Sequence, residues 1–436
     1  MISCLLLIGG LLAGQTAATP DEGLKSDVRR LVRQLDAPQL AQREAAEAEL
    51  LKRGPTILGL LPTDGQAASA EVQQRLGRIR LRLQLAAADS TARASLITLQ
   101  ADNLPLSQIL AAFQQQSGNS ITDYRRQFSQ PATDPKLTIQ FDKTPFWPAL
   151  DKMLDQAGMT LYPYGKPHTL SVVTALGNKE FPRFGRASYS GPFRFEAVWV
   201  RAHRNLAKAD DRALVVTINA AWEPRLQIIT LLDRAADVRA EDDRGRPIPV
   251  WNNSVQNEIP VSMSGATGEP GKSNAAMVPL EPMFQLPPRD AQRIASLKGK
   301  LQATIAGKTE TFRFGELGRA NNVEQRIAGV TVSVEQVRKS GVAWEVRMRA
   351  RFDNAGDALA SHRQWIFDNK AYLEGTDKKP IRFDSYETTL QTKNEVGIAY
   401  FFKTDRPLDE LTFVYQTPGT IINDSFTYEL KDIPLP

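Results

Sequence analysis

The sequence predicts an α+β protein of several domains, in which an N-terminal helical cap precedes a split βαβ domain and two tandem all-β sandwich domains. Three observations predict this class. Apolar residues recur at helical spacing to about residue 85, a strand-helix-strand pattern then occurs twice, and alternating strands separated by Gly, Pro and Asp turns fill the remainder. The expected boundaries are 24–90 for the cap, 94–176 for the βαβ domain, and 186–317 and 325–436 for the sandwiches.

Residues 1–18, "MISCLLLIGGLLAGQTAA", are typical of a secretory signal peptide. The apolar run is too short to span a bilayer, and Thr16 and Ala18 suit the −3 and −1 cleavage positions. A signal peptide usually has Lys or Arg before its apolar run, and none is present here, which is consistent with a sequence whose start is truncated. The alternative interpretation of this segment is a buried N-terminal helix. Because Cys4 is the single cysteine, cleavage leaves a mature protein without disulfides or thiol chemistry. We therefore expect the protein in the periplasm, or otherwise exported.

The charge pattern argues against nucleic-acid binding. The formal charge is +5, but the 54 Lys and Arg residues are interspersed with 49 Asp and Glu residues rather than gathered on one segment. No stretch after the signal peptide approaches 18 apolar residues, so we expect no transmembrane segment after signal cleavage.

The cap reads as a pair of amphipathic helices followed by a third. In "DVRRLVRQLD" one apolar stripe follows helical spacing, formed by Val28, Leu31, Val32 and Leu35. The next fragment, "LDAPQLAQREAAEAELLKRG", resembles a unit of HEAT-like helical repeats, in which paired helices stack. The resemblance implies a small cap or docking module.

The βαβ domain contains the same pattern twice. "QADNLPLSQILAAFQQQSGNSITDY" begins at residue 100, and "QFDKTPFWPALDKMLDQAGMTLYPY" begins at residue 140. In each copy a strand leads into a helix that starts at Pro105 or Pro145 and ends at Gly118 or Gly158. We expect one split βαβ sheet covered on one face by two helices.

These segments resemble the short N-terminal (STN-like) domain of secretins and TonB-dependent outer-membrane receptors, over about residues 94–176. The resemblance implies a protein-interaction element of the cell envelope. No plug, barrel or secretin pore region follows, so transport and secretion are not implied.

The two sandwiches, which we expect to be immunoglobulin-like, read as copies of each other. "EDDRGRPIPV" parallels "EGTDKKPIRF", which places Pro247 opposite Pro380, and the endings "ETFRFGEL" and "DSFTYELKDI" also correspond. The first core is expected to use alternating positions such as Phe195, Ala197 and Trp199, or the neighbouring phase.

No catalytic constellation is present. His168, His203 and His362 are far apart, without carboxylates at metal-ligand spacing. "GATGEPGKS" lacks the first glycine of a phosphate-binding loop. The acidic residues at 210–211 and 241–243 fall in predicted turns, with weak calcium binding at 241–243 as the alternative. We therefore predict no enzymatic activity, no cofactor and no metal.

Trp251, Asn252 and Asn253 are the one candidate ligand-binding group, because an aromatic ring beside two amides on a polar connection suits a sugar. Strand residues such as Trp199 are expected in the core instead. The sequence thus predicts an exported, non-enzymatic interaction or scaffold protein of the bacterial envelope, which binds an envelope protein through its STN-like domain. The alternative is a protein that binds a cell-wall carbohydrate polymer through its sandwiches.

Overall fold

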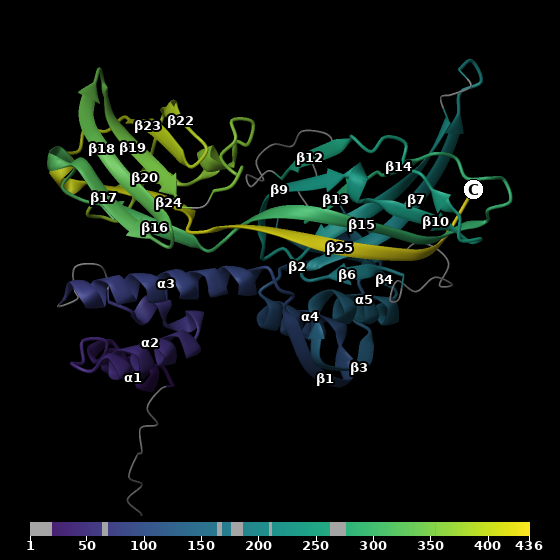
Figure 1. The fold of residues 1–436 in the computed structure, drawn as a ribbon, viewed down its shortest axis with the longest axis horizontal. Helices are drawn as coiled ribbons and strands as arrows, with labels where there is room; N and C mark the ends of the chain where they lie inside the picture. Colours follow the sequence, from purple (N-terminus) through teal and green to yellow (C-terminus); the bar gives the residue numbers. More distant parts are fainter. Residues whose placement is uncertain are drawn as a thin grey trace, which may run out of the picture. The chain divides into compact units, whose positions relative to one another are not determined.

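The computed structural model describes residues 20–62, 69–163, 168–175, 186–208, 212–261, 276–353 and 355–436. The chain is α+β and mostly strand, with a small helical region at its N-terminal end (Figure 1). It divides into two compact units, residues 1–87 and 88–436. The predicted signal peptide and the "GATGEPGKS" segment lie outside the described residues.

The N-terminal unit is helical, as its apolar spacing predicts. Its elements are α1 (Pro20–Gln34), α2 (Leu40–Lys52), η1 (Pro55–Leu60) and α3 (Ala70–Thr91). Gly54 has a φ of 76°, a conformation that suits glycine, and ends the second helix before Pro55. The unit has a core of its own, formed by Val28, Leu31, Leu35, Ala46, Leu50, Ile57, Leu61, Val72, Leu76, Ile79 and Leu83.

The second unit begins with the βαβ domain. Its elements are β1 (Leu96–Pro105), α4 (Leu106–Ser117), β2 (Ile121–Asp123), η2 (Arg125–Phe128), β3 (Lys136–Pro145), α5 (Phe146–Ala157), β4 (Met159–Tyr162) and β5 (Leu170–Thr174).

The sequence repeat produces a two-fold pairing of the halves. Strand β1 pairs antiparallel with β3, so that the start of each strand lies opposite the end of the other. The first amide of each helix is then satisfied by the other half: Leu106 N–H donates to Pro135 O, and Phe146 N–H donates to Ser95 O, both at 2.9 Å. Both helices end at a left-handed glycine, as predicted.

The expectation of one sheet is wrong for this domain. The strands form two sheets, β1–β3 and β2–β5–β4. Because the first strands of the two halves pair only with each other, the second strands pair with β5 instead. Helix α4 packs on β1, and α5 contacts both β3 and β4.

The first sandwich consists of two sheets. One contains β6 (Ser188–Ser190), β7 (Phe193–Arg204), β8 (Arg212–Trp222), β13 (Met277–Leu280) and β14 (Met283–Phe284). The other contains β9 (Gln227–Arg234), β10 (Arg239–Asp242), β11 (Pro247–Ile248), β12 (Gln256–Pro260) and β15 (Arg293–Ala306). Its apolar core is continuous with that of the βαβ domain.

The second sandwich has a separate core. One sheet contains β17 (Asn321–Ile327), β18 (Val330–Ser340), β19 (Ala343–Phe352), β22 (Ser385–Gln391) and β23 (Glu395–Phe402). The other contains β16 (Thr309–Phe314), β20 (Ala371–Glu374), β21 (Pro380–Arg382) and β24 (Thr412–Pro418). Short 3-10 helices join strands in both sandwiches: η3 (Ala235–Asp237) lies in the first, and η4 (Leu317–Arg319), η5 (Trp365–Asp368) and η6 (Leu408–Glu410) follow along the chain.

Equivalent hairpins show the correspondence between the two sandwiches. Glu241 lies opposite Pro247 in the β10–β11 pair, and Glu374 lies opposite Pro380 in the β20–β21 pair. The long hairpins β7–β8 and β18–β19 also share a register shift at the matching place along the strand.

The two copies exchange their last strands. Strand β25 (Ile421–Pro434) pairs with β15 of the first sandwich along its whole length, and β16 pairs with β24 of the second (Figure 1). The predicted ranges 186–317 and 325–436 therefore do not each form one complete sandwich. The first range ends in β16, which lies in the second sandwich, and the second range ends in β25, which lies in the first. At the crossing, Gly307 N–H donates to Thr420 O at 2.8 Å and Gly419 N–H donates to Lys308 O at 2.9 Å. These bonds keep the two-stranded ribbon continuous from one sandwich into the other.

Candidate functional site

The predicted group at Trp251 is only partly assembled. Trp251 is 42% exposed, and its backbone N–H donates to Met283 O at 2.8 Å. Asn252 faces its own turn instead, because its Oδ1 accepts hydrogen bonds from Ser254 N–H at 2.9 Å and from Ser254 Oγ at 2.7 Å. Asn253 is exposed beside them. Trp251 is therefore positioned by Met283, and its ring does not share a hydrogen-bonding group with the Asn252 amide.

Trp251 lies on an exposed sheet surface that also carries Trp199. Val250 bridges to buried Phe284, so the next pair along, Trp251 and Met283, points to the opposite, outer side. Across the sheet, Met283 lies opposite Val215, and Val215 lies opposite Arg201. We call the outer surface formed by Trp199, Arg201, Val215, Trp251 and Met283 the aromatic face.

The expectation that Trp199 lies in the core is wrong. It is 68% exposed. The register shift between Ala197 and Trp199 leaves Val198 as an extra residue, and so Trp199 lies opposite Thr217 on the outer side. Alternation alone cannot reveal this change of phase, because the bulge depends on the partner strand.

Polar groups accompany the tryptophans on the aromatic face. Arg201 Nη2 lies 2.8 Å from Glu281 Oε1, and Thr217 Oγ1 donates to the same oxygen at 3.2 Å. Both members of the ion pair are largely exposed, so they are available to hydrogen-bond a ligand.

The β1–β3 pair offers a second candidate surface. The side chain of Gln116 hydrogen-bonds both backbone groups of Thr98 on β1, as a neighbouring strand would. Its Oε1 accepts from Thr98 N–H at 2.9 Å, and its Nε2 donates to Thr98 O at 3.0 Å. Within the described ranges, β3 pairs with no strand other than β1. Its outward residues, Thr138, Gln140 and Asp142, are exposed. Among the described residues, β3 therefore has an edge without a neighbouring strand.

Buried polar contacts hold the βαβ domain on the first sandwich. Asp151 on α5 accepts from Arg194 Nε at 2.8 Å and from Tyr189 OH at 2.7 Å, and both members of the ion pair are fully buried. Burial raises the pKa of Asp151, and the Arg194 guanidinium opposes that rise. Trp147 Nε1 also donates to Pro192 O at 2.8 Å. These contacts fix the domain that presents β3.

A second buried carboxylate, that of Glu223, also joins the βαβ domain to the first sandwich. Glu223, which is completely buried, accepts from Ser95 N–H at 2.9 Å and from Asn119 Nδ2 at 2.9 Å. Arg225 Nε lies 2.7 Å from it and balances its charge. Ser95 and Asn119 belong to the βαβ domain, so the two parts share polar as well as apolar contacts.

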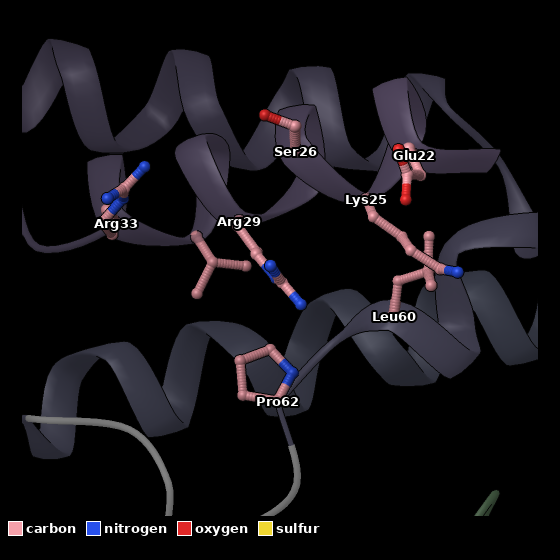
Figure 2. Close-up of a pocket in the computed structure, with 8 residues that line it drawn as sticks. Glu22, Lys25, Ser26, Arg29, Arg33, Leu60 and Pro62 are labelled. Atoms are coloured by element: carbon pink, nitrogen blue, oxygen red, sulfur yellow. The ribbon is translucent and has the colours of Figure 1, made fainter. Parts of the chain in front are cut away.

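The N-terminal unit has a groove of about 730 Å³ between α1 and the end of η1 with the residues that follow it. Figure 2 shows Lys25 and Arg29 extending from α1 toward the side that carries Leu60 and Pro62. Arg33, one turn farther along, also lines it.

Of the three histidines, His362 lies in an ion-pair group. His362 Nε2 lies 2.9 Å from Glu258 Oε1, which also accepts from Arg363. Hydrogen bonding from Arg363, and then from His362, lowers the pKa of Glu258 to about 2, so this group links the sandwiches as an ion pair. No set of three His, Cys, Asp or Glu residues among those described is grouped as metal ligands would be.

The acidic pair at 210–211 lies outside the described residues, whereas His168 and the run at 241–243 lie within them. His168 lines a hollow of about 370 Å³ with Arg225 and Lys308. Asp242 Oδ2 accepts a hydrogen bond from Arg246 Nε at 2.7 Å, and its Oδ1 accepts from Arg246 N–H at 2.9 Å, as in the predicted turn. None of the described helices is both long and apolar enough to cross a membrane.

No protein-family model, no curated protein and no solved structure matches this chain. The resemblances to HEAT-like repeats and to the STN-like domain therefore stay predictions.

Proposed function

We propose that this protein is an exported, non-enzymatic interaction or scaffold protein of the bacterial envelope, which docks a partner protein through its STN-like βαβ domain. The observation that supports the proposal is the open edge of β3 on a domain fixed by buried contacts. That the sandwiches are immunoglobulin-like stays a prediction.

An extended segment of the partner adds to β3 as a further strand. Open strand edges present unpaired N–H and C=O groups, which a partner strand satisfies while side chains on alternate positions give specificity. On β1, Gln116 already bonds both backbone groups of Thr98, and we take β3 as the receptive strand. Because the domain is anchored by Asp151 and Glu223, the edge is held in place before binding and loses little entropy.

In-cell photo-crosslinking tests this docking. A photoreactive residue at Gln140 on β3 should capture one partner, which mass spectrometry then identifies. The control position is Glu387, which is exposed on β22, an edge strand of the second sandwich. Equal capture at both positions, or none at Gln140, would contradict docking through β3.

The aromatic face favours a second candidate function, binding of a cell-wall carbohydrate polymer. Trp251 and Trp199 lie on one outer surface. The path from Trp251 to Arg201 crosses three strand spacings, and Trp199 is two residues from Arg201 along β7, so the two tryptophan backbones are roughly 16 Å apart. Two exposed indoles at such a distance suit several consecutive sugar rings, with the Arg201–Glu281 pair as a source of hydrogen bonds.

Glycan fragments should then quench tryptophan fluorescence. The quench should fall in both Trp251→Ala and Trp199→Ala, while Trp344→Phe in the second sandwich should keep it. A quench that survives both alanine variants would remove this candidate.

A further inference from the structure

The groove on the N-terminal unit carries an ordered row of cations. Lys25, Arg29 and Arg33 stand four residues apart on α1 and all line the groove. Four residues of an α-helix advance about 6 Å, so the charges follow one another along about 12 Å of the helix surface. Glu22, one turn earlier, lies at the end of the row (Figure 2).

Several arginines of the unit that lie outside the row have carboxylate partners. Arg30 and Arg53 lie 3.6 and 3.0 Å from Asp27, and Arg75 lies 3.0 Å from Glu47. In the part of the unit that the structure describes, Arg29 and Arg33 have no acidic partner. Arg29 and Arg33 therefore bring positive charge to the groove without a carboxylate partner among the described residues of this unit.

The side of the groove opposite the cations is apolar. Leu60 and Pro62 face α1, and Val32 lies between the charged residues (Figure 2). A volume of about 730 Å³ is within the range of ligand sites and admits a peptide segment. In an extended peptide, alternate side chains are about 6.7 Å apart, close to the spacing of the cations.

We propose that this groove binds an extended acidic segment of a partner protein, with Asp or Glu at alternate positions paired to Arg29 and Arg33. Intervening apolar side chains of the segment pack on Leu60 and Pro62. A concave groove suits a single chain better than a flat anionic bilayer, which would contact only the rim. The site is separate from β3 and from the aromatic face, and does not depend on either.

Fluorescence anisotropy of the full chain tests the proposal. The probe is a fluorescein-labelled twelve-residue peptide that alternates Glu and Ala, at about 0.15 M salt. The double variant Arg29→Gln/Arg33→Gln should weaken binding about tenfold, since it removes two charge pairs. The matched control is Arg30→Gln/Lys52→Gln, which removes the same charge from exposed positions outside the groove and should change affinity less than about twofold.

Several results would overturn the acidic-segment site. An equal loss in the control variant would show general electrostatic attraction. Binding of vesicles containing phosphatidylglycerol, lost in the groove variant while the peptide does not bind, would assign the cations to a membrane. Helical circular dichroism must match across variants, and the double variant Arg29→Lys/Arg33→Lys should keep binding. Failure here leaves crosslinking at Gln140 unaffected, so the two proposals fail separately.

Discussion

Exchange of the last strands predicts that a substitution in one copy destabilises the other. Phe426 lies ten residues before the C-terminal residue, in the second copy of the sequence, yet its ring centroid is 4.4 Å from that of Phe193 in the first core. Phe312 occupies the matching place in the first copy, yet it is fully buried in the second core. Phe426→Ala should therefore loosen the first sandwich, and Phe312→Ala the second.

The expected effect is large because both rings are buried. Replacement of a buried Phe with Ala costs about 3–5 kcal/mol, and a typical domain is stable by about 5–15 kcal/mol. A loss of about 4 kcal/mol raises the population of the open state roughly a thousandfold, since each 1.4 kcal/mol is a factor of ten.

Hydrogen exchange with mass spectrometry separates the two sandwiches. In Phe426→Ala, slow amides of β7 and β8 should exchange roughly a thousand times faster, while β18 and β19 keep their protection. Phe312→Ala should reverse the pattern. If Phe426→Ala instead exposes β18 and β19, the last strand belongs to its own copy and the exchange does not occur.

Three further substitutions test buried contacts, each by urea denaturation. Burial raises the pKa of Asp233 from 3.8 to about 6, so this group favours the folded state fully below pH 3.8, and that contribution is lost as the pH rises to about 6. Asp233→Asn should therefore gain about 2.5 kcal/mol at pH 8 relative to pH 4, and a constant difference would contradict this. Arg194→Met should cost about 3–5 kcal/mol by leaving Asp151 buried without a cation, and adding Asp151→Asn should recover part of that loss; an additive further loss would contradict it. Gly419→Ala should cost about 1–3 kcal/mol, because the new Cβ would lie 2.5 Å from the Cβ of Ala328, which has no side-chain rotation to escape it; an unchanged midpoint would show that the crossing is loose.

Local signals predict much of this fold. The proline and glycine pairs that bound α4 and α5 act within a single turn of helix, so their effect is readable from the sequence. The sequence similarity between the sandwiches also corresponds to structural similarity, because Pro247 and Pro380 hold equivalent positions in equivalent hairpins.

Features that depend on a partner strand are not predictable in the same way. The bulge that turns Trp199 outward exists only against β8, and residue alternation continues through it. For the same reason the aromatic face is only half visible in the sequence. Trp251 is recognised from its polar turn, whereas its companion Trp199 looks like a core residue.

The strand exchange also has a consequence for docking at β3. Strands β15 and β16 pair with β25 and β24, so the exchanged strands form pairs in both sandwiches. Separating the sandwiches would break backbone hydrogen bonds on both sides of Gly307 and Gly419. The βαβ domain in turn shares its core with the first sandwich. A partner strand that binds β3 therefore holds a body tied together by a shared core and a continuous ribbon, rather than a domain on a flexible linker.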